Sequence, residues 1–136
     1  MTSVAKAALH RWLKPAHNVI SDSTDWAVYC DDVRIAVGSK KSKTGLLALE
    51  GIGYPMASAI LRIWNPKAFP VTDRHAERAI WHYHEDALPP GTRFNNGATY
   101  TTYARTLATS THFGDSSVIH ERDKIAMELG RSLSKT

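Results

Sequence analysis

Cysteine is almost absent from this sequence, which has a single thiol, Cys30, in 136 residues. One cysteine can form no internal disulfide and cannot ligate a four-cysteine iron–sulfur cluster, so neither kind of centre stabilises this chain. Long apolar runs are lacking too, since none approaches the ~20 residues of a membrane span and none stands near the N-terminus. The sequence therefore predicts a cytoplasmic protein without a membrane partner.

An excess of acidic residues is also lacking. Lys and Arg number 17 against 13 Asp and Glu, and the resulting net charge of +4 favours a polyanionic partner. Part of the positive charge lies in residues 39–43, which read Ser-Lys-Lys-Ser-Lys. This stretch fits two interpretations, a solvated turn or a contact to a nucleic-acid backbone.

Strand-like alternation of polar and apolar residues is missing, whereas apolar residues recur at helical spacing along most of the chain. No repeat or linker divides residues 1–136, so a single domain is expected. The predicted fold class is all-α, a compact helical domain of about six or seven helices. The expected helices cover residues 2–14, 26–37, two halves of a hairpin within 43–64, 73–84, 95–110, and a last helix capped by Ser116 or Ser117.

The hairpin is the segment around which the rest is organised. Gly51 and Gly53 follow a short apolar run, and two glycines one residue apart permit positive φ and close approach by another molecule. Pro55 suits the start of a second helix, because its missing N–H has no intrahelical partner there. A helix, a glycine turn and a second helix aim backbone N–H groups outward, where they bind anions such as phosphate.

Residues 49–53, Leu-Glu-Gly-Ile-Gly, followed by Ala57, resemble the hairpin of the helix-hairpin-helix (HhH-GPD) DNA glycosylases, the base-excision enzymes of DNA repair. Residues 69–75, Phe-Pro-Val-Thr-Asp-Arg-His, resemble the family's loop that carries its catalytic aspartate. Asp73 follows Pro55 by 18 positions, which is the spacing that the family keeps between hairpin and aspartate. The matching hairpin core is about residues 43–64, and the aspartate loop and helix about 65–84.

The resemblance implies that Asp73 is the catalytic carboxylate. Cleaving a base from its sugar builds positive charge on the deoxyribose, and an ionised carboxylate can stabilise that charge or activate water. The start of a helix suits this anion, since terminal N–H groups and the helix dipole favour negative charge. From the residues alone, the alternative interpretation of Asp73 is an ordinary N-cap.

Pro55 stands where bifunctional members of the family have a lysine that attacks the sugar. Proline has no side-chain nucleophile, so the resemblance implies a monofunctional enzyme without lyase activity. The family's hairpin often holds a monovalent cation, K⁺ or Na⁺, through backbone carbonyls, and no other cofactor is expected. The carbonyls that match are those of Leu47, Leu49 and Ile52.

The resemblance also implies DNA contacts at the hairpin and on the helix after Asp73, although a solvated helix face is the alternative on that helix. Asp31 and Asp32 are candidates for a second carboxylate. Aromatic side chains could stack on a flipped base or belong to the core; those considered are Trp26, Tyr29, Trp64, Trp81 and Tyr83. The expected DNA-binding residues are Gly51, Gly53, Tyr54, Met56, Ala57, His75 and Arg78.

The chain is an unusually short match to this family, because only 48 residues precede Leu49. Three arrangements are open: a minimal base pocket, a pocket completed by a partner subunit or homo-oligomer, or DNA binding without excision. The function expected is a monofunctional glycosylase that acts on double-stranded DNA in the nucleoid or nucleus. The alternative is a non-catalytic helix-hairpin-helix DNA-binding protein, and a protein-interaction module is a third interpretation.

Overall fold

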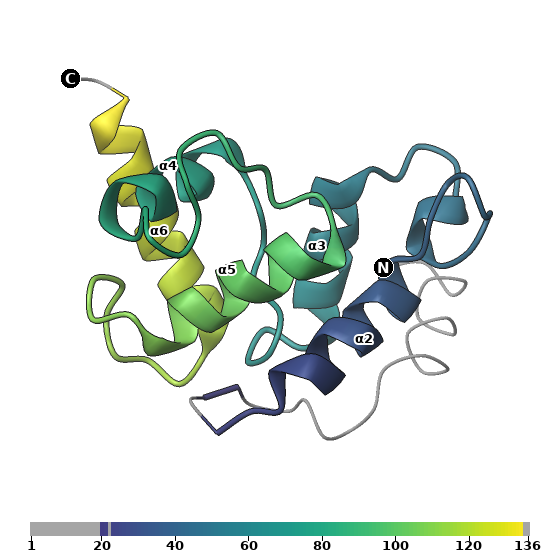
Figure 1. The fold of residues 1–136 in the computed structure, drawn as a ribbon, viewed down its shortest axis with the longest axis horizontal. Helices are drawn as coiled ribbons and strands as arrows, with labels where there is room; N and C mark the ends of the chain where they lie inside the picture. The colour runs from purple at the N-terminus through teal and green to yellow at the C-terminus, as the bar shows by residue number, and fades with distance from the viewer. Residues whose placement is uncertain (1–19, 22, 135–136) are drawn as a thin grey trace.

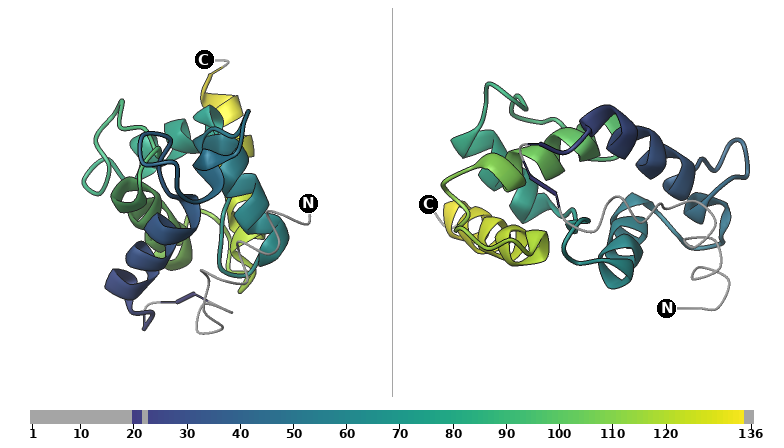
Figure 2. Two further views of the ribbon diagram at one scale, coloured as in Figure 1. Left: turned by 90° about the vertical axis from the view of Figure 1, so that its right-hand side faces the viewer. Right: turned by 90° about the horizontal axis from the view of Figure 1, so that it is seen from below.

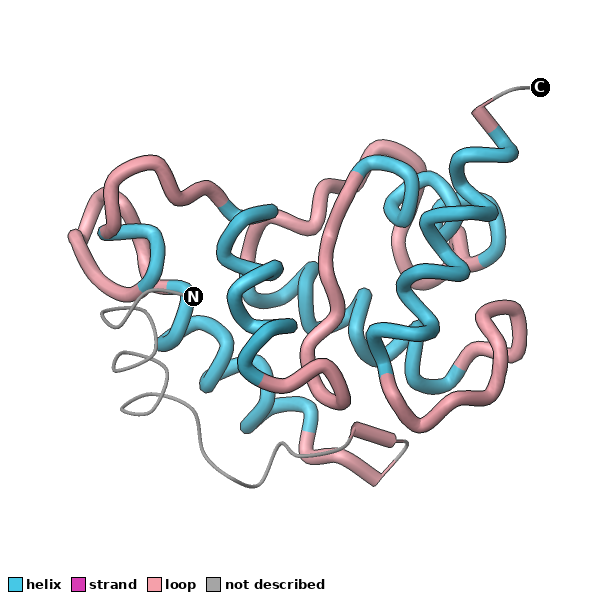
Figure 3. The backbone as a smooth tube through the Cα atoms, turned by 180° about the vertical axis from the view of Figure 1, so that it is seen from behind, coloured by secondary structure: helices cyan, strands magenta, loops and turns pink. Residues whose placement is uncertain are grey.

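The computed structural model describes residues 20–21 and 23–134, and these residues form an all-α domain. They contain five α-helices, one 3-10 turn and no strand. Figure 3 shows the helices in cyan, joined by loops. The predicted fold class is confirmed, and the helix expected over residues 2–14 lies outside the described residues. The elements are α2 (Trp26–Val37), η2 (Leu46–Ala48), α3 (Tyr54–Trp64), α4 (Arg74–Tyr83), α5 (Gly97–Thr109) and α6 (Ile119–Leu133).

Short polar side chains begin three of these helices at the places the sequence predicts. The carboxylate of Asp25 accepts a hydrogen bond from Val28 N–H at α2. At the starts of α4 and α5, the side-chain oxygens of Asp73 and Asn96 likewise accept hydrogen bonds from the N–H groups three residues ahead. These bonds satisfy N–H groups that have no partner inside the helix. At the other end of α2, Gly38 adopts φ 70° and ends the helix.

Two local expectations are wrong. The first half of the hairpin is a single 3-10 turn of three residues, η2, in place of a helix. The last helix has Val118 as its N-cap, because the hydroxyl of Ser116 accepts from Val118 N–H in the turn that precedes the helix. Both segments are short, so local turn geometry decides them more than apolar periodicity does.

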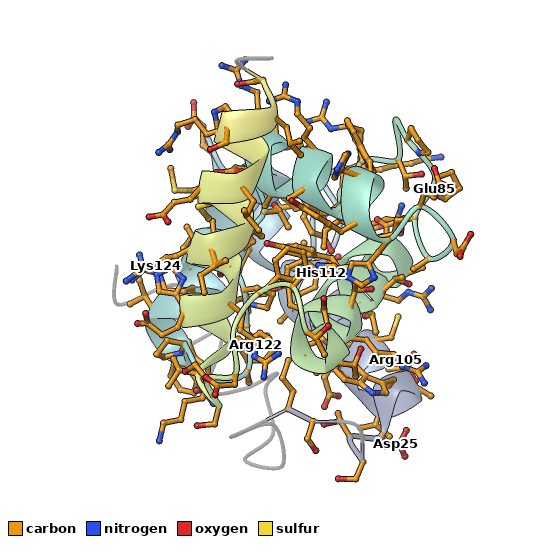
Figure 4. The ribbon with its side chains drawn as sticks, turned by 90° about the vertical axis from the view of Figure 1, so that its left-hand side faces the viewer. Asp25, Glu85, Arg105, His112, Arg122 and Lys124 are labelled. Carbon is orange, nitrogen blue, oxygen red and sulfur yellow. The ribbon has the colours of Figure 1, made fainter. Side chains whose placement is uncertain are left out.

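The helices pack in two main pairs, α4 on α6 and α2 on α5 (Figure 1). Seen from below, α2 and α5 lie along one side of the molecule, with α3 and α6 along the other (Figure 2). A methyl group added at Gly130 of α6 would collide with the carbonyl of His75 in α4, so this pair is in backbone contact. From α6, Arg122 reaches the end of α5 and donates to the carbonyls of Leu107 and Ser110 (Figure 4).

The loop between α3 and α4 is held by buried side chains from several helices. Tyr29 of α2 donates from its hydroxyl to the carbonyl of Ala68, at 2.8 Å. Tyr100 and Tyr103 of α5 donate to the carbonyls of Pro70 and Val71, at 2.7 and 2.9 Å. All three tyrosines are fully buried, so each bond satisfies polar groups that water cannot reach.

The same loop also receives bonds to its N–H groups. Asp123 of α6 accepts from Val71 N–H at 2.7 Å, and the hydroxyl of Ser58 in α3 accepts from Thr72 N–H at 3.1 Å. Four helices therefore fix the backbone that leads into Asp73, which stands directly after Thr72.

No helix of the described residues is both long and apolar enough to cross a membrane.

Candidate active site

Asp73 is half-buried at the N-cap of α4. Its Oδ1 accepts a hydrogen bond from Ala76 N–H at 2.7 Å, so the N-cap interpretation of this residue is confirmed. Among the described residues Oδ2 has no hydrogen-bond partner. One carboxylate oxygen thus fixes the side chain against the helix terminus while the other is free to meet a ligand.

A cleft of about 250 Å³ lies beside this carboxylate, and we call it the Asp73 cleft. It opens where the N-terminal ends of α3 and α4 meet the loop between α4 and α5. Its volume is below the ~300–1,000 Å³ usual for drug-sized ligands, so the cleft suits a smaller group. The residues that line it are Tyr54, Pro55, Thr72, Asp73, Arg74, Glu77, Arg93, Phe94 and Asn95.

Glu77 is a second carboxylate of the cleft that the sequence analysis missed. It is 3 % exposed, and its Oε2 accepts from Arg93 Nε at 3.0 Å and from Phe94 N–H at 2.9 Å. These two bonds tie the loop before α5 to α4 and so form one wall of the cleft. The four-residue spacing from Asp73 puts both acids on one helix face, and this spacing was the available signal.

Asp31 and Asp32, the acids that the sequence offered instead, do not line the cleft. Asp31 is exposed and lies 3.9 Å from the guanidinium of Arg34. Asp32 is buried within α2. Helix α2 therefore contributes no carboxylate to the cleft.

Asp123 of α6 does not line the cleft and is fully buried. Nδ1 of His120 is 2.9 Å from its Oδ1 and 3.1 Å from its Oδ2, and the hydrogen-bond geometry is with Oδ2. Burial raises the pKa of Asp123 to about 6, while the bonds from Val71 N–H and His120 oppose that rise and the charge of Asp73 adds to it.

Tyr54 is one of two aromatic residues that line the cleft, with Phe94, and the sequence predicted it for DNA contact but not for stacking. Its hydroxyl is buried without a hydrogen-bond partner among the described residues. Burial, followed by the neighbouring Cys30 thiol, raises the pKa of the phenol, whereas Arg34 lowers it. The phenol therefore stays protonated and can donate one hydrogen bond.

The five aromatic residues considered for stacking lie elsewhere, since none of them lines the cleft. Tyr29 is core, and Trp26 packs edge-on against it. Trp81 donates from its indole N–H to the carbonyl of Thr92, and Tyr83 stacks on His112. Trp64 packs against the core from the end of α3.

The hairpin glycines differ from one another. Gly51 has φ 81° and is exposed, so this position requires glycine or a strained residue. Gly53 has φ −97° and serves as the N-cap of α3, so the expectation of positive φ is wrong there. The expected phosphate contact from Ala57 N–H is also unavailable, because that group donates to the carbonyl of Gly53 at 2.9 Å.

The N–H groups of Tyr54 and Met56 fall in the first turn of α3, where helix geometry supplies no acceptor and no side chain caps them. Met56 is 52 % exposed and Gly51 is exposed, so the outer part of the turn faces solvent. These backbone groups remain the donors that fit the predicted phosphate contact.

His75 and Arg78, the two residues predicted to contact DNA from the next helix, do not line the Asp73 cleft. The guanidinium of Arg78 lies 3.4 Å from Nδ1 of His75 and donates to the carbonyl of Gly130 at 3.3 Å. Both residues are partly buried. The Arg78 guanidinium thus contacts α6, and Arg78 also lines an open hollow with Trp81 and Glu85. The contact of His75 and Arg78 with DNA stays a prediction.

The carbonyls predicted to hold a monovalent cation come from η2 and the turn after it. That of Leu49 accepts from Ile52 N–H at 3.3 Å, which closes the turn around Gly51. The donor set is neutral backbone oxygen, the chemistry that suits a weakly held cation, and this site stays a prediction. Within residues 20–21 and 23–134, no three side chains of His, Cys, Asp and Glu gather as metal ligands do.

No protein-family model matches the chain, and comparisons with curated proteins and with solved structures found no match either.

Proposed function

We propose that this protein is a monofunctional DNA glycosylase, with Asp73 as its catalytic carboxylate and the Asp73 cleft as its base pocket. The observation that supports the proposal most is the place of Asp73, whose free Oδ2 borders a cleft of about 250 Å³. An ordinary N-cap needs no cleft beside it. The substrate is double-stranded DNA with a damaged, modified or mispaired base.

In the proposed reaction the N-glycosidic bond breaks and a water oxygen bonds to the sugar carbon. The departing base takes the bond's electron pair and a proton. Positive charge builds on the deoxyribose as the bond stretches, and the Asp73 carboxylate stabilises it or accepts a proton from the water. Four helices hold the backbone before Asp73, so the carboxylate needs little reorganisation when the substrate arrives.

The test is a substitution of Asp73 by Asn. Asparagine keeps the size and the capping oxygen but removes the charge, so excision should fall by about 10²–10³-fold while DNA binding persists. We would incubate the full chain with duplexes that carry uracil, hypoxanthine, alkylated or oxidised purines, or mismatches. Alkali and gel electrophoresis then reveal abasic sites.

Asp25→Asn is the matched control, because Asp25 caps α2 with the same kind of bond and does not line the cleft. It should excise at the wild-type rate. Full activity in folded Asp73→Asn would remove Asp73 from the mechanism. Binding to duplexes without excision of any of these bases would replace the enzyme with the alternative, a non-catalytic DNA-binding protein.

The product gives a second prediction. Pro55 lines the cleft at the position where a nucleophilic lysine would stand, and none of the lining residues is a lysine. Without an amine nucleophile no imine to the sugar forms, so the abasic strand should stay intact until alkali or heat is added. Borohydride should trap no protein–DNA adduct, and a trapped adduct mapped to a lysine by mass spectrometry would overturn the monofunctional assignment.

A further inference from the structure

A second hollow of about 500 Å³ adjoins the Asp73 cleft, and three of its lining residues are cations. It lies between the end of α2 with residues 38–45 on one side and the start of α5 on the other. We call it the basic pocket, after Arg34, Lys40 and Lys41. No acidic residue lines it, whereas Tyr54 and Asn95 line both the pocket and the cleft.

The two lysines stand on a tightly closed loop. Ser39 and Thr44 exchange two backbone hydrogen bonds of 3.0 Å, which join the loop at its neck. Gly38 and Gly45 have φ 70° and 65°. A methyl group added at Gly38 would collide with the backbone of Thr44, and one added at Gly45 would collide with the backbone of Val37. Only glycine meets both conditions, so the loop is a built structure rather than a chance run of solvated residues.

Arg34 is pressed against the first residue of α5. A methyl group added at Gly97 would collide with Cγ of Arg34 and lie 3.0 Å from its Nε. The guanidinium is thereby held beside the positive end of the α5 dipole, where a cation is unfavourable. The ion pair of Arg34 with Asp31 offsets little of this repulsion, because the two groups are 3.9 Å apart and largely exposed. An anion bound in the pocket would relieve the repulsion.

Lys40 and Lys41 are exposed and free of carboxylate partners among the described residues, so they add their charge to the same pocket. Oxyanions of phosphate suit such a set, since lysines act as point charges and the guanidinium can donate two hydrogen bonds. The pocket and the Asp73 cleft share Tyr54 and Asn95, so they are adjacent, and a strand with one nucleotide in the cleft can extend to the pocket.

We propose that the basic pocket binds a backbone phosphate of the DNA strand whose base enters the Asp73 cleft. This inference rests on the proposed function for the identity of the polymer. It differs from the predicted hairpin contact, because its donors are side chains of α2 and of residues 38–45 rather than backbone N–H groups of η2 and α3. A phosphate held there would fix the register of the strand relative to Asp73.

The experiment removes the two lysine charges together. The full chain, its Lys40→Gln/Lys41→Gln variant and a control are titrated with a fluorescein-labelled duplex that holds a tetrahydrofuran abasic-site analogue. Anisotropy gives the binding constant across a series of salt concentrations. The control is Lys67→Gln/Lys124→Gln, which removes the same charge from residues that line neither the pocket nor the cleft; Lys124 stands on α6, far from α2 (Figure 4).

The pocket variant should bind about tenfold more weakly than wild type, since hydrogen bonds between charged groups are lost. The slope of log binding constant against log salt should fall by about 1, the value for one phosphate contact. The control should keep the wild-type slope, and Lys40→Arg/Lys41→Arg should keep both values. Equal slopes for the pocket variant and the control would overturn the inference.

The two proposals fail in different ways. If wild type excises a base but the pocket variant and the control bind alike, the phosphate site is wrong and the glycosylase stands. If the slope falls only in the pocket variant and no base is excised, the phosphate site stands and the enzyme does not. A wild-type chain that does not bind the duplex at all would overturn both.

Discussion

The loop before Asp73 and the hairpin before α3 lie near each other in sequence, yet they are held in different ways. Residues 68–72 receive side-chain hydrogen bonds from α2, α3, α5 and α6. Ala48, Leu49 and Ile52 instead donate backbone hydrogen bonds to carbonyls three residues earlier, at 3.2, 3.1 and 3.3 Å. Apolar side chains of this second segment pack against the core, with Leu46 fully buried and Leu47, Leu49 and Ile52 partly so.

Under the proposed function, the first segment leads into the catalytic position and the second is a binding position. A carboxylate that must meet a developing charge needs a fixed place, and buried tyrosines and Asp123 provide one. A turn that presents N–H groups to a phosphate needs only the local conformation that glycine permits. We therefore expect substitutions behind the loop to cost much stability and substitutions in the hairpin to cost little.

The largest effect should come from Asp123→Ala. It leaves the partly buried Val71 N–H without its acceptor and His120 without its partner, at a cost of about 3 kcal/mol in the free energy of unfolding. Urea unfolding followed by circular dichroism measures this cost. Asp115→Ala is the control, since Asp115 is exposed, and it should stay within about 0.5 kcal/mol of wild type.

The same variant has a pH signature with a definite sign. Because the pKa of folded Asp123 is raised to about 6, the folded state binds its proton more tightly than the unfolded state, whose pKa is about 4. The stability that this proton provides is complete below about pH 4 and is lost as pH rises to about 6. The cost of Asp123→Ala should therefore shrink over that range, and a cost that grows instead would contradict the raised pKa.

The sequence predicts what local chemistry determines. Asp25 and Asn96 begin α2 and α5 because their side chains cap N–H groups, and Gly38 ends α2 because it tolerates positive φ. Each decision depends on residues within one helical turn. The Asp73 N-cap follows from the same kind of reasoning, and it is the part of the candidate site that sequence alone located.

What the sequence could not predict depends on distant residues. Tyr100 reads as one apolar position of α5, and nothing local indicates that its hydroxyl meets Pro70, thirty positions earlier. Arg93 stands in a loop, so its bond to Glu77 requires the fold. The helix predicted over residues 46–48 was wrong for the opposite reason. The leucines and alanine there have helical composition, but the glycines on either side leave too few residues for a stable α-helix.

The smallest effects should distinguish the two hairpin glycines, which look equivalent in the sequence. Gly51→Ala forces a side chain into φ 81°, and this conformation costs about 1–2 kcal/mol for a residue with a Cβ. Nothing lies within 4 Å of the added methyl group, so the cost is conformational rather than steric. Gly53→Ala keeps an allowed φ of −97° and meets only Pro55 Cδ at 3.9 Å, so it should lose about 0.5 kcal/mol as a poorer N-cap.

Urea midpoints of the two single variants and the double variant measure this difference at one pH. Gly51→Asn serves as an internal check, because asparagine tolerates the left-handed region better than alanine and should recover part of the loss. Equal losses of stability at the two positions would mean that the turn relaxes around residue 51. The positive φ of Gly51 would then not be required for the hairpin. A larger cost for Gly53→Ala would mean that the start of α3, rather than the turn, is where the hairpin depends on glycine.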